Sequence, residues 1–171
     1  AEVWNALFWI ILLFASMNAT AKSFVQEEHR QHYYYFLCKP TDIISAKLLY
    51  SFISVLVIAV VALLIYIILF GTPVLDFDLY LINLVLGCTG LSAAFTMVSS
   101  IVFKTSNKSL LMAVLGFPII IPVLLLSVSN ANGLMEGFVW IQIRGNVLSL
   151  LSVDVIIIAL TYILFPYTWR S

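Results

Sequence analysis

Charge is what this 171-residue sequence has least of. Only 9% of its residues are charged, with eight Lys and Arg against eight Asp and Glu and a formal net charge of zero. An average soluble domain is about 25% charged, so these few charges cannot cover the surface of a soluble domain. The charge balance also excludes a basic nucleic-acid-binding protein. The 63% of hydrophobic residues exclude a disordered chain.

Side chains that carry chemistry are also scarce. The sequence has two histidines and two cysteines, and it contains no Gly-rich phosphate loop and no HExxH motif. His29 and His32 could form a metal pair, but histidines in a charged run are ordinarily solvated, so we expect no metal site and no catalytic residue. Cys38 is expected in the polar segment 22–47 and Cys88 within the third predicted span, so the two should not meet and no disulfide is predicted.

Long uncharged runs dominate what is present, and the mean hydropathy is +1.13. A helix needs about 20 apolar residues to cross a bilayer. The runs are continuous and lack the alternation of a barrel strand, which favours helices. We therefore predict one all-α transmembrane domain over residues 1–171, a polytopic bundle of five helices. The predicted spans are 3–21, 48–70, 79–103, 109–129 and 147–169.

Lysine and arginine predict the orientation of this bundle. Seven of the eight basic residues fall in segment 22–47, in link 104–108 or after the last span, whereas Arg144 falls alone on the other side. Because such residues mark the cytoplasmic side, we expect the C-terminus inside and Ala1 outside. An outside N-terminus without an initiator Met suggests a preceding helix, which would make six spans in the full chain.

The third predicted span carries a stripe of hydroxyls, Thr89, Ser92, Thr96 and Ser99, at helical spacing. Small residues accompany it, and they include Gly87, Gly90 and Ala94. Gly87, Gly90, Ser92, Ala94 and Thr96 are the residues that we select as functional candidates. They predict either close helix packing or a polar wall along a transport path, and packing is the more common use.

Two prolines and one acid interrupt the later spans. Pro118 and Pro122 each remove a backbone donor, so the fourth span should bend near its middle, either as a static kink or as a moving hinge. Asp154 is the only acid within a span. Counted back from Arg170, it should lie about one turn deep and partly hydrated, the alternative being a partner for a substrate or for Arg144.

The longest polar segment is 22–47. Residues 24–38 read as an amphipathic helix on the inner membrane surface, ended by Pro40. Thr41 or Asp42 should cap the following helix. This segment is either a plain interfacial anchor or a docking helix for a soluble subunit.

Several motifs resemble the heme exporter protein B (CcmB) family. They are Asn5–Ala15, then Phe24-Val-Gln-Glu27 with Pro40 and Lys47, the Gly-rich Leu86–Phe95, the proline-paired Gly116-Phe-Pro-Ile-Ile-Ile-Pro122, and the closing Leu164–Arg170. The resemblance covers nearly the whole chain. Glu, Pro and Lys after a span are also similar to the wider type-2 ABC exporters.

The resemblance implies a six-helix ABC transporter permease of the bacterial inner membrane, coupled to a separate ATP-binding subunit. It implies a second permease copy, other cytochrome c maturation proteins as partners, and haem as the transported or delivered species, with no cofactor bound by this chain. The ATPase-docking residues would be Glu27, Glu28, Arg30, Pro40 and Lys47. The alternative is a membrane scaffold of a cytochrome assembly complex that transports nothing.

Overall fold

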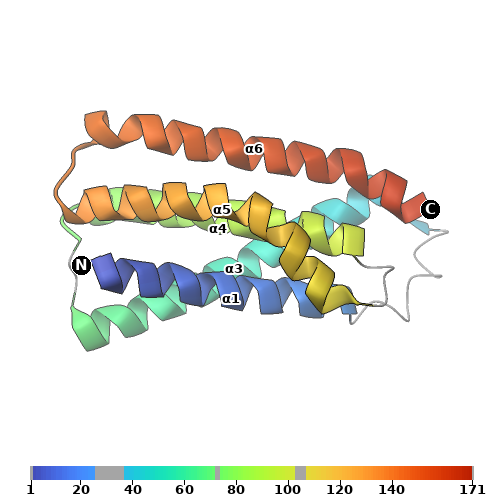
Figure 1. Cartoon of the computed structure of the whole chain (residues 1–171), viewed down its shortest axis with the longest axis horizontal. Helices are drawn as coiled ribbons and strands as arrows, with labels where there is room; N and C mark the ends of the chain where they lie inside the picture. Colours follow the sequence, from blue (N-terminus) through green and yellow to red (C-terminus); the bar gives the residue numbers. More distant parts are fainter. Residues whose placement is uncertain (1, 26–36, 72–73, 103–106, 171) are drawn as a thin grey trace.

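The computed structural model describes residues 2–25, 37–71, 74–102 and 107–170. Within this part of the chain the fold is an all-α bundle without strands (Figure 1). Each of the helices is long and apolar enough to cross a membrane. The five helices are α1 (Glu2–Val25), α3 (Pro40–Phe70), α4 (Phe77–Val102), α5 (Lys108–Met135) and α6 (Trp140–Arg170).

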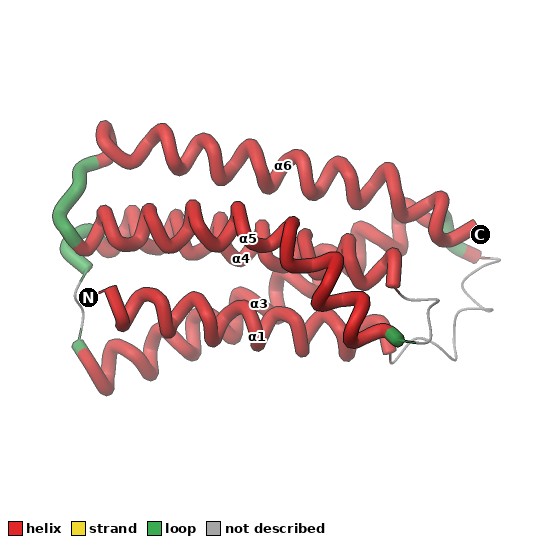
Figure 2. The backbone as a smooth tube through the Cα atoms, viewed as in Figure 1, coloured by secondary structure: helices red, strands yellow, loops and turns green. Residues whose placement is uncertain are grey.

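Successive helices run in opposite directions along the bundle (Figures 1 and 2). The start of α1, the end of α3 and the α5–α6 connection lie at one end, which we call the N end. The end of α6 and the start of α3 lie at the other, which we call the C end. This alternation is the one that the sequence predicted. The assignment of the C end to the cytoplasm stays a prediction.

Helix α4 is the centre of the bundle because it packs against all four other helices. Its small residues allow that close approach. The indole ring of Trp9 on α1 lies directly over Gly87, where an added Cβ would overlap it. Trp9 is only 1% exposed, so its ring is buried in the contact between α1 and α4.

Aromatic rings join α1 to α3 and α4 at the N end. The ring of Trp4 meets Tyr66 edge-on at a centroid distance of 5.2 Å, and Phe8 meets the same ring at 5.6 Å. Tyr80 of α4 closes the group at 6.4 Å from both Trp4 and Phe8. Such edge-to-face pairs contribute about 0.5–1.5 kcal/mol each beyond area burial, which fixes α1 and α3 side by side.

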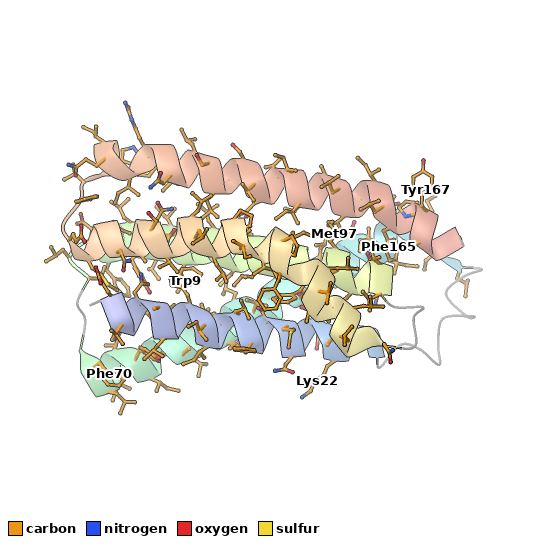
Figure 3. The ribbon with its side chains drawn as sticks, viewed as in Figure 1. Trp9, Lys22, Phe70, Met97, Phe165 and Tyr167 are labelled. Atoms are coloured by element: carbon orange, nitrogen blue, oxygen red, sulfur yellow. The ribbon has the colours of Figure 1, made fainter. Side chains whose placement is uncertain are left out.

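The outward faces of the helices are apolar. Large side chains such as Ile68, Leu125 and Leu148 are more than 60% exposed. Within a bilayer these faces meet lipid, which is as apolar as they are. Charged and polar tips such as Lys22 and Tyr167 point away from the bundle (Figure 3).

The helices are longer than the predicted spans at several ends. Helix α3 begins at Pro40, eight residues before the predicted span 48–70, and α6 begins at Trp140, seven residues before the predicted span 147–169. Lys39 is the N-cap of α3, Pro40 stands in its first turn, and no side chain caps it, so the predicted cap at Thr41 or Asp42 is wrong. Proline suits this place because the first amides of a helix have no partner within it.

Candidate functional site

Helix α5 changes direction near its middle, where it contains Pro118 and Pro122 (Figures 1 and 2). Each proline lacks the N–H that would bond to the carbonyl four residues earlier. The carbonyls of Val114 and Pro118 therefore lose their helical donors, and the rigid ladder is interrupted over one turn. We call residues 108–117 the C-end arm of α5 and residues 123–135 its N-end arm.

Amide side chains fasten the N-end arm to two neighbouring helices. Asn5 of α1 donates from Nδ2 to the carbonyl of Val128 at 3.0 Å and to Asn132 Oδ1 at 2.7 Å. Asn83 of α4 donates to the carbonyl of Ser127 at 3.0 Å and accepts from Asn130 Nδ2 at 3.1 Å. We call these residues the amide network, and it connects α1, α4 and α5.

The C-end arm is held differently. Its hydroxyl contact with α4 runs from Ser99 Oγ to Met112 Sδ at 3.8 Å, and a thioether is a weak acceptor. Leu110, Val114 and Phe117 are each more than half exposed. The two arms thus differ in how firmly the described side chains tie them to the bundle, and the proline pair separates them.

Asp154 of α6 lies inside the bundle against α4. Its side chain is 4% exposed, so the prediction that it is shallow and partly hydrated is wrong. Helix α6 begins seven residues earlier than predicted, at Trp140, which moves Asp154 toward the middle of the helix. Thr89 Oγ1 donates to Asp154 Oδ2 at 2.9 Å, and Oδ1 meets no partner among the described residues.

The hydroxyl stripe of α4 is used largely within its own helix. Ser92 Oγ donates to the carbonyl of Thr89, and Thr96 Oγ1 donates to the carbonyl of Ser92. Ala94 is fully buried beside them, and Gly90 lies against Asp154 and Val123. These positions are helix contacts in this structure, and a transport path along them stays a prediction.

The predicted docking residues are only partly described. Glu27, Glu28 and Arg30 lie outside the described residues, as do His29 and His32 and most of the predicted surface helix. Pro40 opens α3, and Lys47 is 7% exposed two turns later. Between them Ser45 Oγ lies 2.8 Å from Tyr162 Oη of α6, which joins the start of α3 to the last helix.

The part of the chain that the structure describes contains no candidate metal site, because no three His, Cys, Asp or Glu side chains lie together there. Cys38 is exposed near the C end and Cys88 is buried in α4.

The amide network is the feature that the sequence did not predict. Asn5, Asn83 and Asn130 come from three different helices and share no local spacing, so only the tertiary fold brings them together. The sequence did contain one signal for this network, which is the energetic cost of an amide inside a membrane helix. An amide within a membrane helix is costly unless it finds a partner, so each of these asparagines implied an unseen contact.

The whole sequence matches one protein family. The model of the family described as CcmB protein matches residues 1–170. No curated protein and no solved structure matches the chain. Together with the span-capable helices, this establishes a multi-pass membrane protein. The chain therefore belongs to the CcmB family, the permease component of the haem exporter in the cytochrome c maturation system, and is not itself catalytic.

Proposed function

We propose that this permease couples ATP hydrolysis on a separate subunit to movement of α5, in the delivery of haem for cytochrome c assembly. It acts in the bacterial inner membrane with its C-terminus in the cytoplasm. A second copy of the chain and other cytochrome c maturation proteins complete the assembly.

The unequal attachment of the two arms of α5 is the observation that supports this proposal. The amide network holds the N-end arm to α1 and α4, and the proline pair removes the donors that would stiffen the turn before it. A push on the C-end arm would therefore bend the helix at the prolines before it moved the N-end arm.

The C end is also the end of the bundle on which a docked ATPase would exert force. The segment between Val25 and Pro40 leaves α1 and enters α3 at that end. It is 14 residues long, too short to hold a nucleotide-binding domain. A soluble ATPase docked on Glu27, Glu28, Arg30 and Pro40 would act on α3, and through the Ser45–Tyr162 contact on α6. Lys47 is buried in α3 and would not take part in this docking.

No histidine of this chain would coordinate the haem iron while haem is transported or released. Iron in haem is held by His, Met, Cys or Tyr, and both histidines are in the predicted cytoplasmic segment. Contact with the apolar porphyrin face, or with partner proteins, would then hold the cargo.

Charge reversal at the docking segment tests the proposal. Glu27→Lys/Glu28→Lys should reduce copurification of the ATPase severalfold, because rim charges contribute about 0.2–1 kcal/mol each. The matched control is Asp76→Lys/Asp78→Lys, which makes the same charge change at the N end. Unchanged copurification together with unchanged cytochrome c levels would favour the alternative, a scaffold that no ATPase drives.

A further inference from the structure

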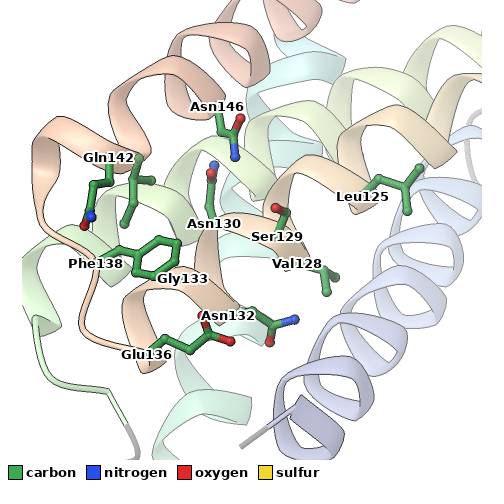
Figure 4. Close-up of a pocket in the computed structure, with 11 residues that line it drawn as sticks. Leu125, Val128, Ser129, Asn130, Asn132, Gly133, Glu136, Phe138, Gln142 and Asn146 are labelled. Atoms are coloured by element: carbon green, nitrogen blue, oxygen red, sulfur yellow. The ribbon is translucent and has the colours of Figure 1, made fainter.

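A cavity of about 430 Å³ opens between α5 and α6 near the N end (Figure 4). Eleven residues line it, and none belongs to the proline pair or to the predicted docking segment. The family resemblance assigned no role to this part of the chain.

The lining changes from apolar to polar along the bundle. Leu125 and Val128 line the cavity toward the middle of α5, and Glu136, Phe138 and Gln142 line it at the end of the helix pair. Leu125 is 66% exposed, so the apolar part of the cavity continues onto the outer face of the bundle. A molecule that fits this gradient has an apolar part within the bilayer and a polar part at its edge.

Amides form the polar wall. Asn130 of α5 and Asn146 of α6 point toward one another across the gap between the helices (Figure 4). Asn130 is 1% exposed, and its Oδ1 finds no partner among the described residues although its Nδ2 bonds to Asn83. A buried acceptor without a donor is costly, so this wall is suited to a ligand that brings donors.

The charge at the mouth of the cavity is negative. Glu136 is the only ionisable residue among those that line it, and no Lys or Arg lines it. Glu136 is also the C-cap of α5, and the C-terminus of a helix carries the negative end of its dipole. Both charges favour a cation on the α5 side of the cavity. The N-terminus of α6, which begins at Trp140 close to the lining residue Gln142, carries the positive end of its dipole and suits a phosphate on the other side.

We propose that this cavity binds the headgroup of phosphatidylethanolamine from the adjoining leaflet. The primary ammonium would donate hydrogen bonds to Glu136 and to the amide oxygens, and the phosphodiester would accept from the amide nitrogens of Gln142 and Asn146. The acyl chains would follow Leu125 and Val128 into the bilayer. Phosphatidylcholine has the same charges but its quaternary ammonium has no N–H, so it lacks the donors that this wall needs.

Retention of lipid by the purified permease complex tests the proposal. The complex is reconstituted with equal amounts of phosphatidylethanolamine and phosphatidylcholine, and native mass spectrometry measures the lipids that stay bound. We expect the wild type to retain the ethanolamine lipid about threefold to fivefold better, the range of one net hydrogen bond. Glu136→Gln, which exchanges a charged acceptor for a weaker neutral one, should reduce the preference without abolishing it, because the amide oxygens remain. Glu2→Gln, an exposed acid at the same end, should leave the preference unchanged.

Two further measurements distinguish a lipid held in the cavity from lipid held elsewhere on the bundle and from a soluble headgroup. Asn146→Leu should lower retention of both lipids, whereas Asn18→Leu, an exposed amide bonded to its own helix, should not. Millimolar soluble phosphoethanolamine should not displace the lipid, because it lacks the apolar part. Equal retention of both lipids by the wild type, an equal loss in Glu2→Gln, or displacement by the soluble headgroup would each overturn the proposal.

Discussion

Asp154 of α6 closes directly over Gly90 of α4. A Cβ at residue 90 would overlap Asp154 Oδ1 and would come within 2.6 Å of Val123 Cγ1 of α5. Three helices therefore meet at a residue that has no side chain, and the carboxylate occupies the space that a side chain would need. Thr89, next to the glycine, donates to the other carboxylate oxygen. Gly90 is required here for close approach and not for an unusual backbone angle, because its φ is helical.

Gly90→Ala should destabilise the bundle by about 1–3 kcal/mol, the cost of overpacking a filled interior. The measurement is thermal unfolding of the purified protein in a fixed detergent. Gly145→Ala is the matched control, because nothing lies within 4 Å of a Cβ at that position. It should be neutral or slightly stabilising, since Ala favours helix over Gly by up to about 1 kcal/mol.

The partner of this change can be tested in the same assay. Asp154→Ala removes the carboxylate that the new methyl group would strike, so it should recover part of the stability lost in Gly90→Ala. Additive losses in the double variant would show that the two residues do not share this contact.

Thiol labelling should reveal the orientation of the bundle. Leu75 and Val139 are exposed at the N end, and Cys38 is exposed near the C end. In a Cys38→Ser/Cys88→Ser background, cysteine at position 75 or 139 should react with an impermeant maleimide added to spheroplasts. Cys38 of the Cys88→Ser protein should react only after the membrane is opened. The reverse pattern would overturn the predicted topology.

Replacing both central prolines should stiffen α5. Pro118→Ala/Pro122→Ala restores two backbone donors, each contributing about 1 kcal/mol, which would shift a bent–straight equilibrium by about thirtyfold. We expect normal membrane levels of the protein with reduced c-type cytochromes, measured by haem staining. Pro166→Ala in α6 is the control for removing a helix-interior proline, and it should support wild-type cytochrome levels. If the double variant does as well, the bend is static.

Haem titration of the purified chain should give no sharp low-spin Soret band, because we expect no axial histidine from this subunit. The comparison is the His29→Ala/His32→Ala variant, whose absorption spectrum should match that of the wild type. A wild-type band that disappears in the variant would contradict this expectation.

The sequence predicted the helices better than it predicted their ends. Uncharged runs located all five, since a bilayer span needs a long apolar stretch. The predicted boundaries stopped at charges such as Lys47 and Arg144, but a helix continues past a charge whose side chain finds a suitable environment. Lys47 is buried within α3, and Arg144 stands exposed in the first turns of α6.

Features that depend on contacts between helices were harder to predict from the sequence. Asp154 was placed by counting along one helix, which carries no information about the glycine on α4 that makes room for it. Asn5, Asn83 and Asn130 form a network that no spacing within one helix encodes. The proline pair was visible because its effect on the backbone is local. Whether that bend moves depends on partners that the sequence of one chain does not contain.

The central claim is that ATP drives the C-end arm of α5 relative to its N-end arm. The most direct measurement is the distance between spin labels in the assembled transporter, nucleotide-free and trapped with ATP and vanadate. One pair is Leu110 and Ile163 and the other is Leu125 and Leu148, all of them exposed. Leu110 lies eight residues before Pro118, an arm of about 12 Å, so a rotation of about 20° would move it by about 4 Å. We expect the first distance to shift by this amount and the second to stay constant. An unchanged first distance, or an equal shift in both, would contradict the account.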